Sequence, residues 1–189
     1  MKRNFKYDIM KEIQNRWSPR AFKNETISKD DLLPLIETAR YAPSCFNEQP
    51  WKFIIAYKEE QLNTMRSVLL DSNRLWADRA PSFIMIISKK IFSLDGKENY
   101  WSKFDAGTAW GYLSLEAEKM GFITHAMGGF KKDLAREKFN IPDDYDILTI
   151  IAVGKLGEKD TLPTDDLRDR EKPGLRKPLE DIFIEDRFK

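Results

Sequence analysis

The sequence predicts one mixed α/β domain with three or four strands, followed by a charged C-terminal arm. Short apolar runs typical of buried strands alternate with longer segments of helical periodicity. The length of 189 residues fits a single domain. Beyond residue 154 the periodic pattern stops, and 19 of the last 35 residues are charged. We therefore divide the chain into a body, residues 1–154, and an arm, residues 155–189.

The first half of the body alternates helix and strand signals. Apolar residues on one helical face predict an amphipathic helix over residues 4–14. Ser28 and Asp31 resemble a capping box that opens a second helix, and Pro34 removes one backbone donor from its second turn. The remaining elements expected in this half are a strand over 51–57, a helix over 59–70 and a fully apolar, buried strand over 82–88.

The second half of the body begins with a long helix. Residues 105–120 carry Ala, Leu, Glu and Lys at helical spacing, and Gly121 is expected to cap the C-terminal end. The elements expected after it are a strand over 123–127, a helix over 132–139 and a buried strand over 146–153.

Composition excludes several classes of function. One cysteine, Cys45, and one histidine, His125, make a Cys-rich metal site, a zinc site and a histidine-based triad poor expectations. The net charge of +1 gives no reason to expect a nucleic acid or a membrane surface as partner. The segment after Met1 is polar and has no signal-peptide core, so we expect a cytoplasmic protein without metal.

The segment Arg16-Trp17-Ser18-Pro19-Arg20 follows the first predicted helix. In an extended segment, two guanidiniums and a hydroxyl at alternating positions project to one side. Arginine binds phosphate oxygens bidentately, and a serine hydroxyl adds a hydrogen bond. The segment therefore indicates an anion site, with a solvated basic turn as the alternative.

The segment from Ala42 to Trp51 combines prolines with amide side chains just before a strand. Asn47 and Gln49 can each donate and accept, as the edge of a heteroaromatic ring with alternating C=O and N–H groups requires. An ordinary turn is the alternative. Cys45 in this loop has no readable His or Asp partner, which favours a packed, inert thiol over a nucleophile.

The segment from Thr124 to Phe130 places Gly128-Gly129 directly after a strand. Paired glycines let backbone N–H groups approach a ligand closely, whereas a turn with positive φ is the bland alternative. His125 is favoured as a structural histidine bonded to the backbone over a general acid.

The arm has two interpretations. A charge-rich C-terminus is usually a solvated tail, and residues 172–179 alone are a solvated basic stretch. However, Leu179, Phe188 and the run Ile182-Phe183-Ile184 are too apolar to stay loose. The arm is therefore expected to pack on its own body or on a second subunit.

Taken in order along the chain, these motifs resemble the FMN-dependent nitroreductase family. The segment from Arg16 to Phe22 looks like its N-terminal flavin-phosphate motif, and residues 42–51 are similar to its most specific signature. Asn73 lies where members often carry a flavin-contacting asparagine. Further matches in order are Asp105-x-Gly107, Gly121-Phe122, residues 127–130 and residues 176–180.

The resemblance implies an α+β homodimer with a central mixed, largely antiparallel sheet flanked by helices, and with C-terminal arms exchanged between subunits. It implies FMN at the dimer interface and NADH or NADPH as electron donor. No side chain is implied as catalytic, because flavin N5 carries the chemistry. The implied phosphate ligands are Arg16, Ser18, Arg20 and Arg176, and the other implied FMN contacts are Trp17, Pro43, Ser44, Cys45, Asn47, Asn73, Met127, Gly128 and Gly129.

The resemblance implies ping-pong reduction of a nitroaromatic, quinone or similar small-molecule acceptor. Two alternatives stay open. One is a specialised flavin enzyme of the same fold, either dehalogenase-like or flavin-consuming. The other is a flavin-binding module without turnover.

Overall fold

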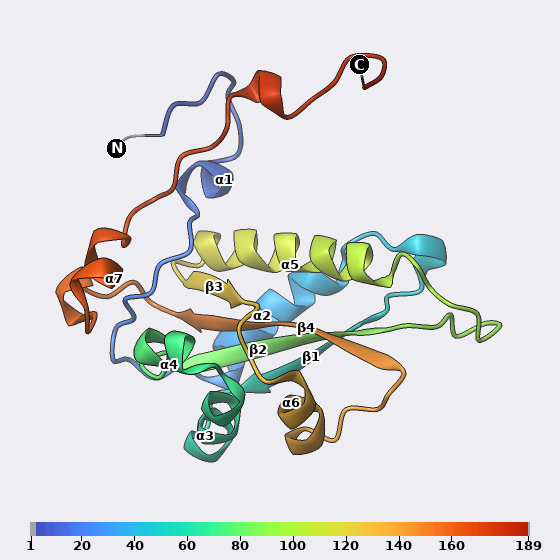
Figure 1. Ribbon diagram of the computed structural model, residues 1–189, viewed down its shortest axis with the longest axis horizontal. Helices are drawn as coiled ribbons and strands as arrows, with labels where there is room; N and C mark the ends of the chain where they lie inside the picture. Colours follow the sequence, from blue (N-terminus) through green and yellow to red (C-terminus); the bar gives the residue numbers. More distant parts are fainter. Residues whose placement is uncertain (1–2, 189) are drawn as a thin grey trace.

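A four-stranded sheet lies between two layers of helices in the computed structural model, which describes residues 3–188 (Figure 1). The strands are β1 (Trp51–Ala56), β2 (Ser82–Lys89), β3 (Ile123–Met127) and β4 (Tyr145–Gly154). Their order is β1-β2-β4-β3, and all three neighbouring pairs are antiparallel. The predicted α+β fold with a largely antiparallel sheet is confirmed.

The central strand β2 is buried on both faces, as its apolar sequence predicts. Alternate side chains point to opposite faces of a strand. Phe83 and Met85 therefore join the core on one face of the sheet, while Ile84 and Ile86 join the core on the other. Each face consequently needs its own helical cover.

Helices α2 (Lys29–Arg40) and α5 (Ser102–Lys119) cover one face. The predicted capping box opens α2: the Ser28 amide donates to Asp31 Oδ2 at 2.8 Å, and the Asp31 amide donates to Ser28 Oγ at 3.2 Å. Helix α5 ends before Gly121, which has a φ of +76° as the predicted C-cap requires.

Helices α3 (Glu59–Val68), α4 (Asp71–Ala77) and α6 (Lys132–Lys138) cover the opposite face. Sequence periodicity predicted one helix over 59–70 and missed α4. The chain turns at Leu69 and Leu70, both extended, before α4 begins. Trp76 of α4 is buried in this core and stacks on Phe22 with ring centroids 6.3 Å apart.

The first helix is shorter than predicted: α1 spans Lys11–Asn15 instead of residues 4–14. The apolar residues that predicted it, including Phe5, Ile9 and Ile13, are exposed. A short helix gains most of its stability from packing, and within this one chain the apolar face lacks a buried contact. The apolar periodicity therefore does not correspond to a buried helical face within residues 3–188.

The arm packs on its own body before it leaves it. It contains η2 (Lys159–Thr161), α7 (Asp165–Asp169) and η3 (Leu179–Asp181). Leu162 and Leu167 are buried in the core that α3 and α4 share. From Leu175 onward its large apolar side chains are exposed. This last stretch runs beside the N-terminal segment, where Lys6 and Glu180 form an ion pair at 3.4 Å (Figure 1). Across residues 3–188, no helix is long and apolar enough to cross a membrane.

Candidate functional site

Arg16 lies in a cluster of three guanidiniums, two from the N-terminal segment and one from the C-terminal arm. Arg3 Nη1 donates to the Arg16 carbonyl at 2.8 Å, and Arg176 approaches from the arm. Burial, and after it the nearby charges of Arg176 and Arg3, lower the pKa of Arg16. Within residues 3–188, none of the three guanidiniums lies within ion-pair distance of a carboxylate. Three like charges are thus held together, and the nearby charge of Glu118 offsets them only in part.

Ser18 belongs to the same cluster. Arg16 Nη1 donates to the Trp17 carbonyl at 3.2 Å and lies 3.5 Å from Ser18 Oγ. The hydroxyl and the guanidinium therefore share one side of the extended segment, as the alternation predicted. A phosphate placed here could accept from both.

Arg20 lies in a different charge environment. Its backbone amide donates to Glu171 Oε1 at 2.8 Å, and its guanidinium lies over the Trp76 ring, 5.9 Å from the centroid. Burial and the neighbouring Arg170 lower the pKa of Arg20. With Arg170 and Lys172 it lines a hollow of about 420 Å³. Arg16 and Arg20 therefore occupy neighbouring but separate cationic positions.

His125 fastens this segment to β3. Its Nδ1 lies 2.9 Å from the Pro19 carbonyl, where a protonated Nδ1 donates, and its ring centroid is 4.5 Å from that of Trp76. Burial lowers its pKa to about 4, so the imidazole is neutral at pH 7. The interpretation of a structural histidine bonded to the backbone is confirmed.

The glycine pair after β3 faces Asn73 of α4. Asn73 Nδ2 donates to the Gly129 carbonyl at 2.9 Å, and a Cβ on Gly129 would lie 2.8 Å from that nitrogen. Neither glycine has a positive φ, so the close approach of Asn73 explains Gly129 and a special turn does not. A Cβ on Gly128 would meet no atom within 4 Å. The backbone beside buried Met127 is thus open to a ligand.

The loop around η1 (Cys45–Asn47) is held in a strained conformation. Phe46, Asn47 and Gln49 have φ values of +52°, +56° and +51°. The half-buried Cys45 donates its amide to Oδ2 of the buried Asp105 at 3.0 Å, and Ser44 Oγ accepts from the Gln49 amide at 3.0 Å. Bulky residues at positive φ cost energy and cluster at functional sites. Pro43 and Asn47 are exposed beside this turn.

The structure brings the predicted residues together in two groups and not in one. Arg16 is near Glu118 in the last turns of α5, where both charges influence each other, whereas Cys45 is bonded to Asp105 in the first turns. Thirteen residues of helix separate these positions by about 20 Å. Figure 1 shows α1 over one end of α5 and the loop of η1 at the other. We call these groups the cationic end and the loop end.

Each predicted residue lies at one of these ends or adjoins it. At the cationic end lie Arg16, Trp17, Ser18, Arg20 and Arg176, and at the loop end lie Pro43, Ser44, Cys45 and Asn47. Asn73, Met127, Gly128 and Gly129 adjoin the cationic end, because Trp76 of the same helix as Asn73 contacts Arg20 and His125 of the same strand as Met127 bonds Pro19.

Sequence reasoning missed three residues of the cationic end. Arg3 precedes the helix without any motif, Trp76 lies on the helix that was not predicted, and Glu171 is one of many charges in the arm. Glu171 accepts from the Arg20 and Ala21 amides, 151 and 150 residues away in sequence. No local signal identifies such partners.

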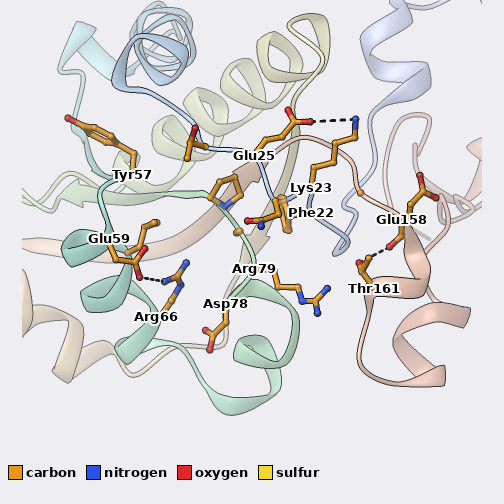
Figure 2. Close-up of a pocket in the computed structure, with 16 residues that line it drawn as sticks. Phe22, Lys23, Glu25, Tyr57, Glu59, Arg66, Asp78, Arg79, Glu158 and Thr161 are labelled. Carbon is orange, nitrogen blue, oxygen red and sulfur yellow. Dashed lines mark hydrogen bonds and ion pairs between the residues drawn. The ribbon is translucent and has the colours of Figure 1, made fainter.

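A hollow of about 870 Å³ lies apart from both ends (Figure 2). Its walls carry Arg66 paired with Glu59 at 3.2 Å, and Lys23 near Glu25 at 3.7 Å. It contains none of the predicted site residues. Across residues 3–188, no three His, Cys, Asp or Glu side chains are grouped to hold a metal ion. Volume alone therefore does not identify the site.

Comparisons with known proteins agree with the resemblance noted from the motifs. The family model described as "Nitroreductase family" matches residues 13–155. A solved structure described as an oxidoreductase containing FMN is 38% identical, covers 99% of this chain and 96% of its own, and superposes with a TM-score of 0.93.

Two curated relatives cover most of the chain at lower identity. The Archaeoglobus fulgidus protein named "Putative NADH dehydrogenase/NAD(P)H nitroreductase" is 25% identical over 84% of this chain and 92% of its own. Iodotyrosine deiodinase from Thermotoga neapolitana is 26% identical over 78% of this chain and 87% of its own.

Proposed function

The chain belongs to the nitroreductase family, and we propose that it uses FMN to pass electrons from NADH or NADPH to nitroaromatic, quinone or similar acceptors. The similarity to an FMN-containing oxidoreductase over almost the whole chain supports this cofactor. The observation that carries the proposal is the cluster of Arg3, Arg16 and Arg176, which form no ion pair within residues 3–188 and have only Glu118 as a nearby negative charge. A flavin phosphate supplies the missing charge.

The residues of the cationic end fit FMN. Arg16, Ser18 and Arg176 would hold the phosphate through charge-assisted hydrogen bonds, which are about twice as strong as neutral ones. The open backbone at Gly128 and the amide of Asn73 would meet the ribityl chain and the ring. The Asn73 side chain lies close against the backbone of Gly129, and its hydrogen bond holds that backbone in place.

We propose that a second copy of the chain completes each site. The loop end carries Pro43, Ser44, Cys45 and Asn47 about 20 Å along α5 from the cationic end, which is too far for one flavin ring to contact both in one chain. Ile182, Phe183 and Ile184 expose more than half of their surface. Burying such side chains contributes about 1.5–3 kcal/mol each, so the arm is expected to pack on the partner. A symmetric dimer then holds two equivalent sites.

The protein's own groups bind and orient; none is proposed as an acid or base. His125 is neutral and its Nδ1 is used by Pro19, so it holds the phosphate segment in place. FMN held by these residues would supply the redox chemistry at N5, accepting a hydride from NAD(P)H and giving two electrons to the acceptor in a ping-pong cycle. A nitro group that takes two electrons and two protons becomes a nitroso group and water. One half-buried thiol and a reduced nicotinamide donor favour the cytoplasm.

The absorption spectrum of the purified protein tests this proposal. We expect flavin bands that bleach when NADH or NADPH is added without oxygen. Steady oxidation of NAD(P)H with menadione or nitrofurazone would then separate an enzyme from a flavin-binding module without turnover. A colourless protein that takes up no added FMN would contradict the assignment.

Reductive dehalogenation is the second candidate, because a relative covering 78% of the chain is named an iodotyrosine deiodinase. Release of iodide from iodotyrosine by the reduced enzyme would support it. Reduction of nitroaromatics without any iodide release would favour the first proposal.

A further inference from the structure

We propose that an aromatic pocket at the loop end binds the electron acceptor and selects uncharged or cationic aromatic acceptors over anionic ones. This inference rests on the proposed function, because it assigns a substrate preference to the same site. The pocket lies between η1 and the hairpin of residues 90–99, which we call the 90–99 hairpin.

The hairpin is a defined structure. Its ends are joined by the Asn99 amide, which donates to the Lys90 carbonyl at 2.7 Å. Near its tip, the Phe92 amide donates to the Lys97 carbonyl at 2.8 Å, and Gly96 turns the chain with a φ of +70°. The hairpin therefore presents the side chains between Phe92 and Lys97 at a fixed position.

Four apolar side chains line the pocket, whose volume is about 760 Å³. Phe46 is 91% exposed and meets Phe92 edge to face, with ring centroids 6.0 Å apart. Leu94 is 95% exposed and Tyr100 is exposed on the same pocket. The volume and the aromatic walls suit one small planar molecule.

Hydrogen bonds between the η1 turn and the 90–99 hairpin hold these side chains in their exposed positions. Phe46 adopts a positive φ, which is costly for a bulky residue and needs support from its surroundings. That support comes from Glu48, whose Oε1 accepts from the Ser93 hydroxyl at 2.6 Å and from the Ser93 amide at 2.9 Å. The turn and the hairpin are thereby fastened together around the open pocket.

The position of the pocket links it to electron transfer. Phe46 stands between Cys45 and Asn47, which are both assigned to the flavin of the partner subunit. A ring lying against Phe46 would therefore lie beside that flavin. Transfer of a hydride between two rings requires contact of this kind.

The charges at the rim determine which ring is favoured. Glu48, Asp95 and Glu98 line the pocket, against the single cation Lys97, which pairs with Asp95 at 2.9 Å. The pocket thus carries an excess of negative charge. A carboxylate or sulfonate on the acceptor is repelled by it, and an ammonium group is attracted.

Three nitrobenzenes of matched shape test the charge preference: 4-nitrobenzyl alcohol, 4-nitrobenzoate and 4-nitrobenzyl-trimethylammonium. The FMN-loaded protein is reduced with dithionite without oxygen and mixed with each acceptor, so that nicotinamide binding plays no part. The measured quantity is the ratio of reoxidation rate constants for the cation and the anion, each normalised to the alcohol. Normalisation to the wild-type protein cancels differences in intrinsic reactivity.

Charge variants should move this ratio in opposite directions. Glu98→Gln should lower it by about two- to fivefold and Lys97→Gln should raise it by a similar factor, as expected for exposed charges. Glu60→Gln on the distant helix α3 removes the same charge outside the pocket and is the matched control. Leu94→Ala should slow all three acceptors by about tenfold through lost apolar contact.

Two outcomes would overturn the inference. One is the same ratio in Glu98→Gln, Lys97→Gln and Glu60→Gln. The other is a Leu94→Ala protein that sediments as a monomer, because the pocket would then be a subunit contact. Failure of the proposed function would show earlier, as a protein that binds no FMN before any acceptor is mixed.

Discussion

The two ends of α5 suit different kinds of ligand group. At the cationic end, Arg176 of the arm meets Arg3 and Arg16 of the N-terminal segment, and Glu118 relieves their mutual repulsion only in part. At the loop end, the strained turn of Cys45–Asn47 is fixed by local bonds and exposes a flat aromatic surface. The first end suits an anion, which is recognised by charge. The second suits a planar ring, which is recognised by shape and contact.

The two ends also differ in how they are held. Tertiary contacts build the cationic end, and it is rigid because His125 and Glu171 hold its segment from two sides. The loop end needs only Asp105 and Glu48 to keep its form. Each end is therefore held by its own contacts, but each carries only part of the set of predicted flavin contacts.

The largest expected effect concerns charge at the cationic end. Arg16→Ala combined with Arg176→Ala should weaken FMN binding by about two to four decades, since each charge-assisted bond is worth about 1.5–3 kcal/mol. Riboflavin, which lacks the phosphate, should bind almost as before. Flavin fluorescence titration measures both affinities.

Arg20→Ala is the informative companion variant. The family resemblance implies that Arg20 binds the phosphate, and the structure places it over Trp76 beside Arg170. A loss confined to FMN would keep it in the phosphate set. Equal losses for both flavins would show that it supports the fold.

The next effect is acid destabilisation of the cationic end through His125. Its pKa falls from about 6.5 in the unfolded chain to about 4 in the folded chain, so the unfolded state binds the proton more readily. His125 therefore contributes about 3 kcal/mol to the free energy of unfolding above pH 6.5. This contribution decreases as the pH falls toward 4 and is lost below pH 4.

Urea unfolding at several pH values measures this effect. His125→Asn keeps a donor for the Pro19 carbonyl but does not titrate, so its stability should fall less between pH 6.5 and 4 than that of the wild type. Parallel pH curves for the two proteins would show that His125 does not contribute.

The smallest expected signal is also the most specific to the two-ended site. One chain carries Arg16→Ala with Ser18→Ala, and another carries Asn47→Ala; each homodimer should bind FMN weakly. After unfolding and refolding together, random pairing puts about half of the chains in heterodimers, and each heterodimer has one intact site, so roughly a quarter of wild-type sites should return. No recovery in a mixture that contains heterodimers would place the whole site within one chain.

The sequence predicted local structure well, because local structure depends on neighbouring residues. The strand over 123–127, the capping box at Ser28 and the C-cap at Gly121 follow from apolar runs, side-chain caps and backbone freedom. The first helix was predicted too long, since its apolar face at Phe5 and Ile13 lacks a buried surface in this chain. Apolar periodicity indicates that a helix needs a surface to pack against, but it does not show whether the chain provides that surface.

The candidate site was predictable only as motifs. The residues of each motif can be recognised from the sequence. The separation of Arg16 from Cys45 along α5, however, depends on the path of the whole chain. Arg3 and Glu171 carry no spacing signal, because they meet their partners only after the chain ends fold back.

The hydrogen bond from the Arg20 amide to Glu171 can form only late in the synthesis of the chain. The two residues are 151 positions apart, and a ribosome that adds about 5–20 residues per second needs roughly 8–30 s to go from one to the other. Throughout that interval the nascent chain has Arg16 and Ser18 but not Arg176. The proposed phosphate site, which includes Arg176, is therefore complete only after the arm has been synthesised.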